Sequence, residues 1–198
     1  MISIKISIYK LFVIGLFSVF LYGCPVFSEK TIVDNGPLPE SAKLVVPYKN
    51  GENYKFKFSN GLVINFTAER ETVDAIDNGC AECFNFEQHY QRDIIKLKPD
   101  YPLFDISFEI NNLDTIEIHC ELDIGNSYYY IPTNEQKTSY IEQFDSLLID
   151  SVFYKNVFKL DPNYFNNKQT LTDSLYYNYK FGILKLIKSN NETYTILP

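Results

Sequence analysis

The stretch FDISFEINNLDTIEIHCEL, residues 104–122, decides the fold class of this chain. Every second residue from Phe104 to Ile110 is apolar and the residues between them are polar, and the same alternation returns from Ile116 to Leu122. The turn-forming run Asn111 to Asp114 separates the two. A period of two turns one face of each strand to the core and the other to water, as in antiparallel sheets. The stretch therefore predicts a β-hairpin with one buried face.

The alternation continues on both sides of this hairpin. Tyr54–Phe58 and Leu62–Glu69 flank Ser59-Asn60-Gly61, which predicts a second hairpin. We expect further strands at Lys43–Val46, Phe84–Leu97 with an interruption, Tyr128–Ile131, Ile141–Ile149, Val152–Leu160, Ser174–Tyr179, Ile183–Ile187 and Glu192–Leu197. A helix competes in Thr133–Leu148, where apolar residues recur near helical spacing, and we predict a strand preceded by a short helical turn. About ten short strands indicate an all-β domain, an antiparallel β-sandwich or β-barrel.

The N-terminus carries the features of an export signal. Met1–Lys10 contains Lys5 and Lys10 and no acidic residue, and the apolar run Leu11–Leu21 follows it. The run is shorter than the roughly 20 residues that a membrane-spanning helix needs. A basic segment, a short apolar core and small residues at its end are typical of a secretory signal peptide.

The end of this leader resembles the lipobox of bacterial lipoproteins. Leu21-Tyr22-Gly23-Cys24 offers an aliphatic residue, a tolerant position, a small residue and the cysteine that accepts the lipid, although Tyr22 is larger than the usual occupant. Several acyl chains on Cys24 would give stable membrane attachment. The alternatives are an ordinary signal peptide with an incidental Cys24 and an uncleaved N-terminal helix. Pro25 in place of an aspartate favours the outer membrane within the cell envelope.

These features divide the chain into three parts. We expect residues 1–23 to be the lipoprotein signal peptide and residues 24–42 a lipidated tether, because Asn35-Gly36-Pro37 and Pro39 oppose both helix and strand. The β domain would then begin near Lys43 and occupy residues 43–198. Its length suits a single domain with a substantial hydrophobic core.

Charge and composition exclude some partners. Loss of residues 1–23 removes two lysines and no acid, which leaves 16 basic residues against 25 acidic ones. Nucleic acid is therefore not an expected partner, because phosphate binding draws on a concentrated basic surface. Sixteen Tyr and sixteen Phe without Trp supply the aromatic residues that strands favour.

Three cysteines remain after Cys24, and an odd number leaves at least one thiol unpaired. Cys80-Ala81-Glu82-Cys83 predicts a disulfide in an exported protein, either Cys80–Cys83 or one of these to Cys120; free thiols and a metal site are the alternatives. His119 and Cys120 point to opposite faces of their predicted strand, which opposes a shared metal ion. We expect His119 to lie on a solvated face, and we expect no metal and no cofactor.

No catalytic motif stands out in the sequence. It contains no glycine-rich phosphate loop, nucleophile elbow or zinc-protease helix motif, and acid pairs such as Asp145 with Asp150 read as surface carboxylates. The tripeptide of Asp, Ser or Thr, and an apolar residue resembles the O-glycosylation sequon of Bacteroidota. Its hydroxyl positions, candidates for modification, are Thr115, Ser146, Ser151 and Ser174.

Two further segments carry a family resemblance. Together with the lipobox leader, Val152–Phe158 and Leu175–Lys185 look like segments of uncharacterised lipoproteins of Bacteroidota. The resemblance implies a lipid anchor and an all-β domain, and it implies no chemistry.

These observations predict a non-enzymatic, membrane-anchored module of the cell envelope. Its partners would be the membrane, through the lipid, and an envelope protein, a glycan or an apolar ligand. The alternative function is a carrier of a lipid or other apolar ligand in a β-barrel cavity, which requires an apolar pocket of several hundred Å³. A hydrolase would require a cleft that joins His89 or His119 to carboxylates.

Overall fold

The computed structural model describes residues 30–78, 86–122, 127–133, 142–162 and 172–197. The chain forms two compact units. The smaller consists of residues 1–32 and 78–87, and within it Lys30 forms an ion pair with Glu87. The larger consists of residues 33–77 and 88–198 and contains the core and the sites described below.

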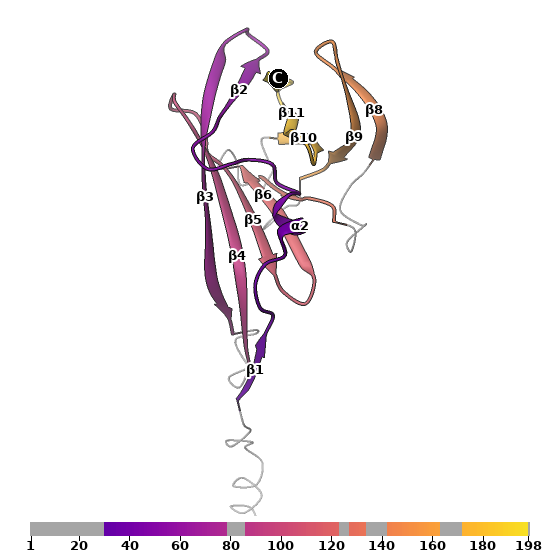
Figure 1. Ribbon diagram of the computed structural model, residues 1–198. Helices are drawn as coiled ribbons and strands as arrows, with labels where there is room; N and C mark the ends of the chain where they lie inside the picture. Colours follow the sequence, from indigo (N-terminus) through magenta and orange to yellow (C-terminus); the bar gives the residue numbers. More distant parts are fainter. Residues whose placement is uncertain (1–29, 79–85, 123–126, 134–141, 163–171, 198) are drawn as a thin grey trace, which may run out of the picture. The chain divides into compact units, whose positions relative to one another are not determined.

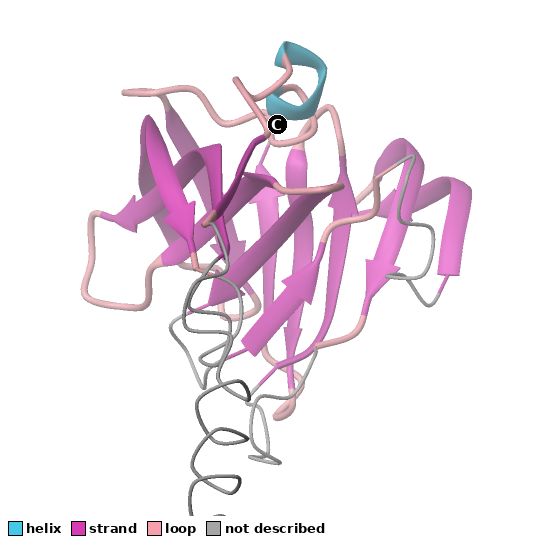
Figure 2. Cartoon of the chain, turned by 90° about the horizontal axis from the view of Figure 1, so that it is seen from below, coloured by secondary structure: helices cyan, strands magenta, loops and turns pink. Residues whose placement is uncertain are grey.

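The larger unit is built on one curled antiparallel sheet (Figure 1), in which strands make up most of the described chain (Figure 2). The elements in chain order are β1 (Thr31–Asp34), α2 (Glu40–Lys43), β2 (Asn53–Phe58), β3 (Val63–Asp77), β4 (Phe86–Pro99), β5 (Ile106–Asn112), β6 (Ile116–Leu122), β7 (Ser127–Tyr130), β8 (Glu142–Ile149), β9 (Val152–Leu160), β10 (Thr172–Asn178), β11 (Gly182–Lys188) and β12 (Thr193–Leu197). The strand order is β7-β6-β5-β4-β3-β2-β12-β11-β10-β9-β8, and β1 pairs with β4 beside this path. The all-β prediction is confirmed.

The register of the central hairpins follows the apolar alternation. In β5 and β6, Phe108 pairs with Cys120 and Ile110 with Ile118, and all four side chains are buried. Between β2 and β3, Phe56 pairs with Ile64, again on the buried face. One face of the sheet therefore forms the core, and we call the opposite face the outer face.

The core is filled by large side chains from both halves of the sheet. Tyr48, Phe108 and Tyr177 are completely buried, with the Tyr48 and Phe108 rings 5.3 Å apart and the Phe108 and Tyr177 rings 6.2 Å apart. Tyr48 comes from the segment before β2, so this segment supplies core residues although it contains no strand. Among the described residues no helix is long and apolar enough to cross a membrane.

The N-terminal boundary of the packed chain lies earlier than predicted. We expected a tether up to residue 42, but Leu38 and Ala42 belong to the core. The Asn112 side-chain amide donates to the carbonyls of Asn35, Gly36 and Pro37, which holds this Gly- and Pro-containing segment against the end of β5. Side-chain hydrogen bonds thus satisfy backbone groups that secondary structure leaves open.

The strand predicted at Lys43–Val46 is also wrong. The chain makes the short helix α2 and then turns, because the Leu44 N–H donates to the Glu40 carbonyl and the Val45 N–H to the Ala42 carbonyl. The strand predicted at Ile141–Ile149 is confirmed as β8, Glu142–Ile149. The helix that competed in Thr133–Leu148 does not form in residues 142–148. Residues 134–141 lie outside the described part. We predicted an interruption in the strand at Phe84–Leu97. In the described part of this range the strand β4 is continuous, from Phe86 to Pro99.

Strand β3 continues well beyond the predicted end at Glu69. It reaches Asp77 and pairs with β4 without a break from Phe66 opposite Pro99 to Asp77 opposite Gln88. From Glu71 onward its side chains are exposed or half-buried on both faces, so the sequence lacks the apolar alternation that signals a strand.

Candidate functional site

The outer face of β4 to β7 carries a cluster of polar and aromatic side chains. The backbone register aligns them, because Glu109 pairs with His119 and His119 with Tyr130, and directly paired residues share a face. Arg92 joins them from β4 and Tyr128 from β7. We call these five residues, Arg92, Glu109, His119, Tyr128 and Tyr130, the His119 cluster.

Close contacts order the His119 cluster. The His119 Nε2 lies 3.3 Å from the Glu109 Oε2, and the Arg92 Nη1 lies 3.6 Å from the same oxygen. The His119 ring lies over Tyr128 with centroids 4.8 Å apart, and Tyr128 meets Tyr130 edge to face at 5.0 Å. Stacked rings and a shared carboxylate fix the side chains before any ligand binds.

The prediction of a solvated His119 is wrong, since only 15% of its side chain is exposed. His119 does lie on the outer face, as the alternation predicts, but the aromatic rings of β7 cover it. The hydrogen bond from His119 lowers the pKa of Glu109. Burial raises the pKa of the Tyr128 hydroxyl, which is therefore neutral at physiological pH.

Within the described part of the chain, three buried polar atoms around the His119 cluster have no hydrogen-bond partner. They are the Arg92 Nε, the His119 Nδ1 and the Oδ1 of Asn111, a neighbouring residue that pairs with Arg92 and is 8% exposed. Buried polar atoms without a partner cost about 1–3 kcal/mol each. The three atoms are shielded from solvent, so a polar partner would hydrogen-bond instead to the Arg92 and Glu109 side chains, which are each 34% exposed.

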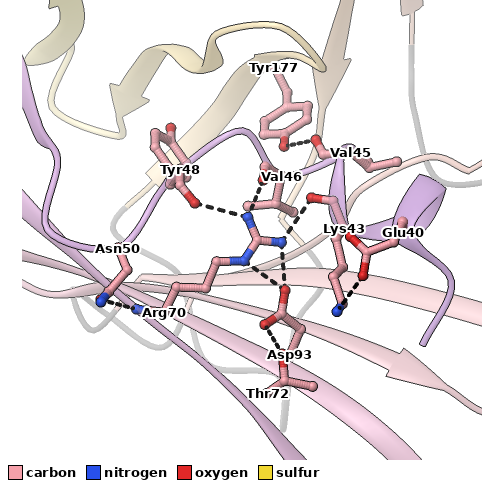
Figure 3. Close-up of polar contacts among 10 residues, drawn as sticks. All are labelled: Glu40, Lys43, Val45, Val46, Tyr48, Asn50, Arg70, Thr72, Asp93 and Tyr177. Atoms are coloured by element: carbon pink, nitrogen blue, oxygen red, sulfur yellow. Dashed lines mark hydrogen bonds and ion pairs between the residues drawn. The ribbon is translucent and has the colours of Figure 1, made fainter. Parts of the chain in front are cut away.

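A second polar network lies inside the larger unit (Figure 3). The Arg70 Nε and Nη2 donate to the Asp93 Oδ2 at 2.8 and 2.5 Å, and the Thr72 hydroxyl donates to the Asp93 Oδ1. The Arg70 guanidinium also donates to the carbonyls of Lys43, Val46 and Tyr48. The Asp93 side chain is 1% exposed.

The Arg70 network holds structure together and is not a ligand site. Its donors are directed at backbone carbonyls of residues 43–48, and the Tyr177 hydroxyl donates to the Val45 carbonyl beside them at 2.6 Å. Sequence analysis missed this network, because Arg70 follows Glu69 and precedes Glu71 and reads as one charge of an exposed polar run.

The described residues line three notable pockets. One of about 440 Å³ places His89 near Asp34 and Asp74, which brings a histidine and two carboxylates to one hollow. One of about 270 Å³ lies between Ala42, Ile118 and Tyr179, and one of about 730 Å³ between Leu44, Lys55 and Phe181. Within the described part of the chain, no three His, Cys, Asp or Glu side chains are grouped to hold a metal ion.

The structure describes one of the four cysteines, Cys120. Cys24, Cys80 and Cys83 lie outside the described residues. Cys120 is a free, fully buried thiol on the core side of β6, so the proposed bridge from Cys80 or Cys83 to Cys120 is not present. The core position was predicted correctly from the alternation.

We expect Cys120 to be unreactive in the folded protein. Burial raises the pKa of its thiol well above the ordinary value, and the thiolate is the reactive form. Iodoacetamide at neutral pH should leave Cys120 unmodified in the native chain and modify it fully in urea, as measured by peptide mass spectrometry. Modification of Cys120 at comparable rates with and without urea would contradict its burial.

The four candidate glycosylation positions differ in accessibility. Thr115 and Ser146 are exposed, as is Ser151 in the turn between β8 and β9. Ser174 is only 8% exposed, because it lies in β10 opposite Ile187. Ser174 is therefore the least accessible of the four in the folded domain, and all four positions stay predictions.

Comparison of the chain with protein-family models, with curated proteins and with solved structures finds no match.

Proposed function

We propose that this chain is an exported lipoprotein, anchored in the cell envelope through a lipid on Cys24, whose β domain is a non-enzymatic binding module. The leader with its two lysines, its short apolar run and Leu21-Tyr22-Gly23-Cys24 supports the anchor. The outer membrane is the proposed location, because Pro25 follows the lipidated cysteine.

Metabolic labelling tests the anchor. A fatty-acid probe should label the wild-type chain in its host, and Cys24→Ser should abolish the label and release the chain from membranes. Cys80→Ser is the matched control, because it removes a thiol at a position that carries no lipid in this proposal. Equal labelling of wild type and Cys24→Ser would refute the anchor.

The filled core favours a binding module over a carrier of apolar ligands. A carrier of the lipocalin kind encloses its ligand inside the barrel. In the described residues that space holds Tyr48, Phe108 and Tyr177, each completely buried. The pocket of about 730 Å³ is also lined by Lys49, Glu52 and Lys180, so it is not the enclosed apolar cavity that a carrier needs. A partner would therefore bind on the outside, where polar groups are available.

The His119 cluster is the observation that supports a polar partner. Its two tyrosines offer rings for stacking, and Arg92 and Glu109 offer charged hydrogen-bonding groups that are partly exposed. A hydroxyl-rich glycan or a polar protein surface could hydrogen-bond to these groups. The cluster contains no serine, threonine or cysteine nucleophile, and this supports binding without catalysis.

Photo-crosslinking tests this assignment in the host. A photoreactive amino acid at position 117, which neighbours His119 on the outer face, should yield an adduct, whereas one at the exposed position 101 should not. His119→Ala should reduce the adduct at position 117 without lowering the amount of chain. Adducts that are equal at both positions, or that do not depend on His119, would exclude this face as the binding site.

A further inference from the structure

Charge is unevenly distributed along the sheet of the larger unit. The half of the sheet that runs in the order β2-β12-β11-β10-β9-β8 contains six lysines and three acidic residues. Strands β5 and β6, by contrast, contain three glutamates and no lysine or arginine. In a chain with a net charge of −7 this separation produces a basic region on one half of the sheet.

The register collects the lysines on the outer face. A continuous row of paired residues crosses five adjacent strands, from Lys57 through Thr195, Lys185 and Tyr176 to Lys159. Because directly paired side chains share a face, Lys57, Lys185 and Lys159 all belong to the face opposite the core. Four strand spacings of about 4.8 Å make the row about 19 Å long. Lys55 precedes Lys57 by two residues in β2, so it lies on the same face and extends the row along that strand.

Most of these lysines have no acidic neighbour among the described residues. We call Lys55, Lys57, Lys159 and Lys185 the lysine row; among the described residues none of the four forms an ion pair. Five other lysines do, namely Lys30 with Glu87, Lys43 with Glu40, Lys49 with Glu52, Lys98 with Glu69 and Lys188 with Glu192. Lys159 lies directly opposite Glu142 of β8, whereas Lys55, Lys57 and Lys185 are paired with no acidic residue, so these three carry the uncompensated positive charge of the lysine row.

We infer that the lysine row docks the domain on the anionic phospholipid surface of the membrane that carries its anchor. This inference rests on the proposed lipid at Cys24. Val33, the start of the larger unit, lies nine Cα–Cα steps beyond Cys24, and at about 3.5 Å each these steps reach at most about 30 Å. The anchor thus keeps the domain at high effective concentration near the bilayer, where weak attraction is sufficient.

Charge complementarity determines which face approaches the bilayer. The mature chain has an excess of acidic residues, so an anionic surface repels most of its faces and attracts the lysine row. Docking through β2, β11 and β9 leaves the His119 cluster, on β4 to β7, available to a partner. The lysine row would therefore orient the binding module as well as hold it.

Vesicle sedimentation tests this docking independently of the lipid anchor. The full chain with Cys24→Ser carries no acyl chain, and its binding is measured to vesicles of phosphatidylcholine alone or mixed with phosphatidylglycerol. Four Lys→Gln changes in the lysine row are compared with four in the ion-paired Lys30, Lys43, Lys49 and Lys98, which alter net charge equally. The leader is present in every variant and contributes equally.

Each lysine at an anionic surface strengthens binding about fivefold. Changing the lysine row should weaken binding to phosphatidylglycerol vesicles at least about 25-fold, the loss expected if only two of the four lysines contact the surface. The control set should weaken it several-fold less, and 1 M salt, which shortens the screening length to about 3 Å, should remove the difference. Neither set should change binding to phosphatidylcholine.

If both sets of substitutions weakened vesicle binding equally, or if those in the lysine row did not weaken it, docking on the membrane would be refuted. An acidic protein or glycan would then be the partner of this face. Thermal unfolding by circular dichroism confirms that both variants fold. Failure of fatty-acid labelling at Cys24 would refute the anchor alone, because the vesicle experiment contains no acyl chain.

Discussion

Arg70→Met is expected to lower the free energy of unfolding by about 3–5 kcal/mol, the range observed when one partner of a buried ion pair is removed. The substitution keeps an apolar stem of similar length but leaves the Asp93 carboxylate buried, with only the Thr72 hydroxyl as a donor from the network. The carbonyls of Lys43, Val46 and Tyr48 also lose their donor. Urea denaturation followed by circular dichroism measures the change.

Two comparisons separate the contributions to this loss. Lys98→Met breaks the exposed pair with Glu69 and should cost far less, because exposed ion pairs contribute little to stability, so it controls for loss of a charge. The double variant Arg70→Met, Asp93→Leu removes the isolated carboxylate, so it should recover part of the stability. The remainder measures the anchoring of residues 43–48. A single variant as stable as Lys98→Met would show that the buried pair does not stabilise the fold.

Gly182→Ala is the second substitution with a large expected effect, about 2–5 kcal/mol. Gly182 has a φ of +77°, where a side chain costs about 1–2 kcal/mol. An added Cβ would lie 2.9 Å from the Cε2 of Tyr48 and closer still to its Cζ and Oη. Tyr48 cannot retreat easily, because it is completely buried, its hydroxyl accepts the Ile183 N–H at 2.7 Å, and its ring meets Tyr54 at 4.7 Å. Overpacking of a core adds about 1–3 kcal/mol.

Gly51→Ala provides the matched control for backbone strain. Gly51 has a φ of +78°, and an added Cβ would meet nothing within 4 Å. Its substitution should therefore cost only the conformational penalty of about 1–2 kcal/mol. The difference between the two variants in urea denaturation isolates the overlap with Tyr48. Equal losses at both positions would mean that Tyr48 shifts without cost.

The accuracy of the sequence-based predictions follows the local pattern. Strands β6 and β9 have the predicted bounds, because turn-forming residues flank both ends of each in the sequence. The outer part of β3 was missed, since neither face of it is buried and no alternation marks it. Residues 43–48, before β2, were wrongly predicted to begin with a strand. Nothing in their sequence shows that Arg70, some 25 residues away, donates hydrogen bonds to their carbonyls.

For the candidate sites too, the sequence predicted what a local pattern determines and missed what depends on contacts between distant strands. Alternation placed His119 and Cys120 on opposite faces, which the structure confirms. It could not place Arg92 and Tyr128 beside His119, because strands β4 and β7 become neighbours of that residue only through sheet order. The lysine row escaped detection for the same reason, as its members lie up to 130 positions apart in the sequence.

By itself, the sequence determined the fold class and the inward and outward positions of most strands, and it predicts a leader that ends at Cys24. All three are local properties, set by the period of the backbone and by neighbouring residues. Tertiary structure alone decided which strands adjoin, how Arg70 fixes the chain before β2, and which polar groups gather around His119 or along the lysine row. These depend on the register between distant strands, and register arises only when the whole sheet closes over its common core.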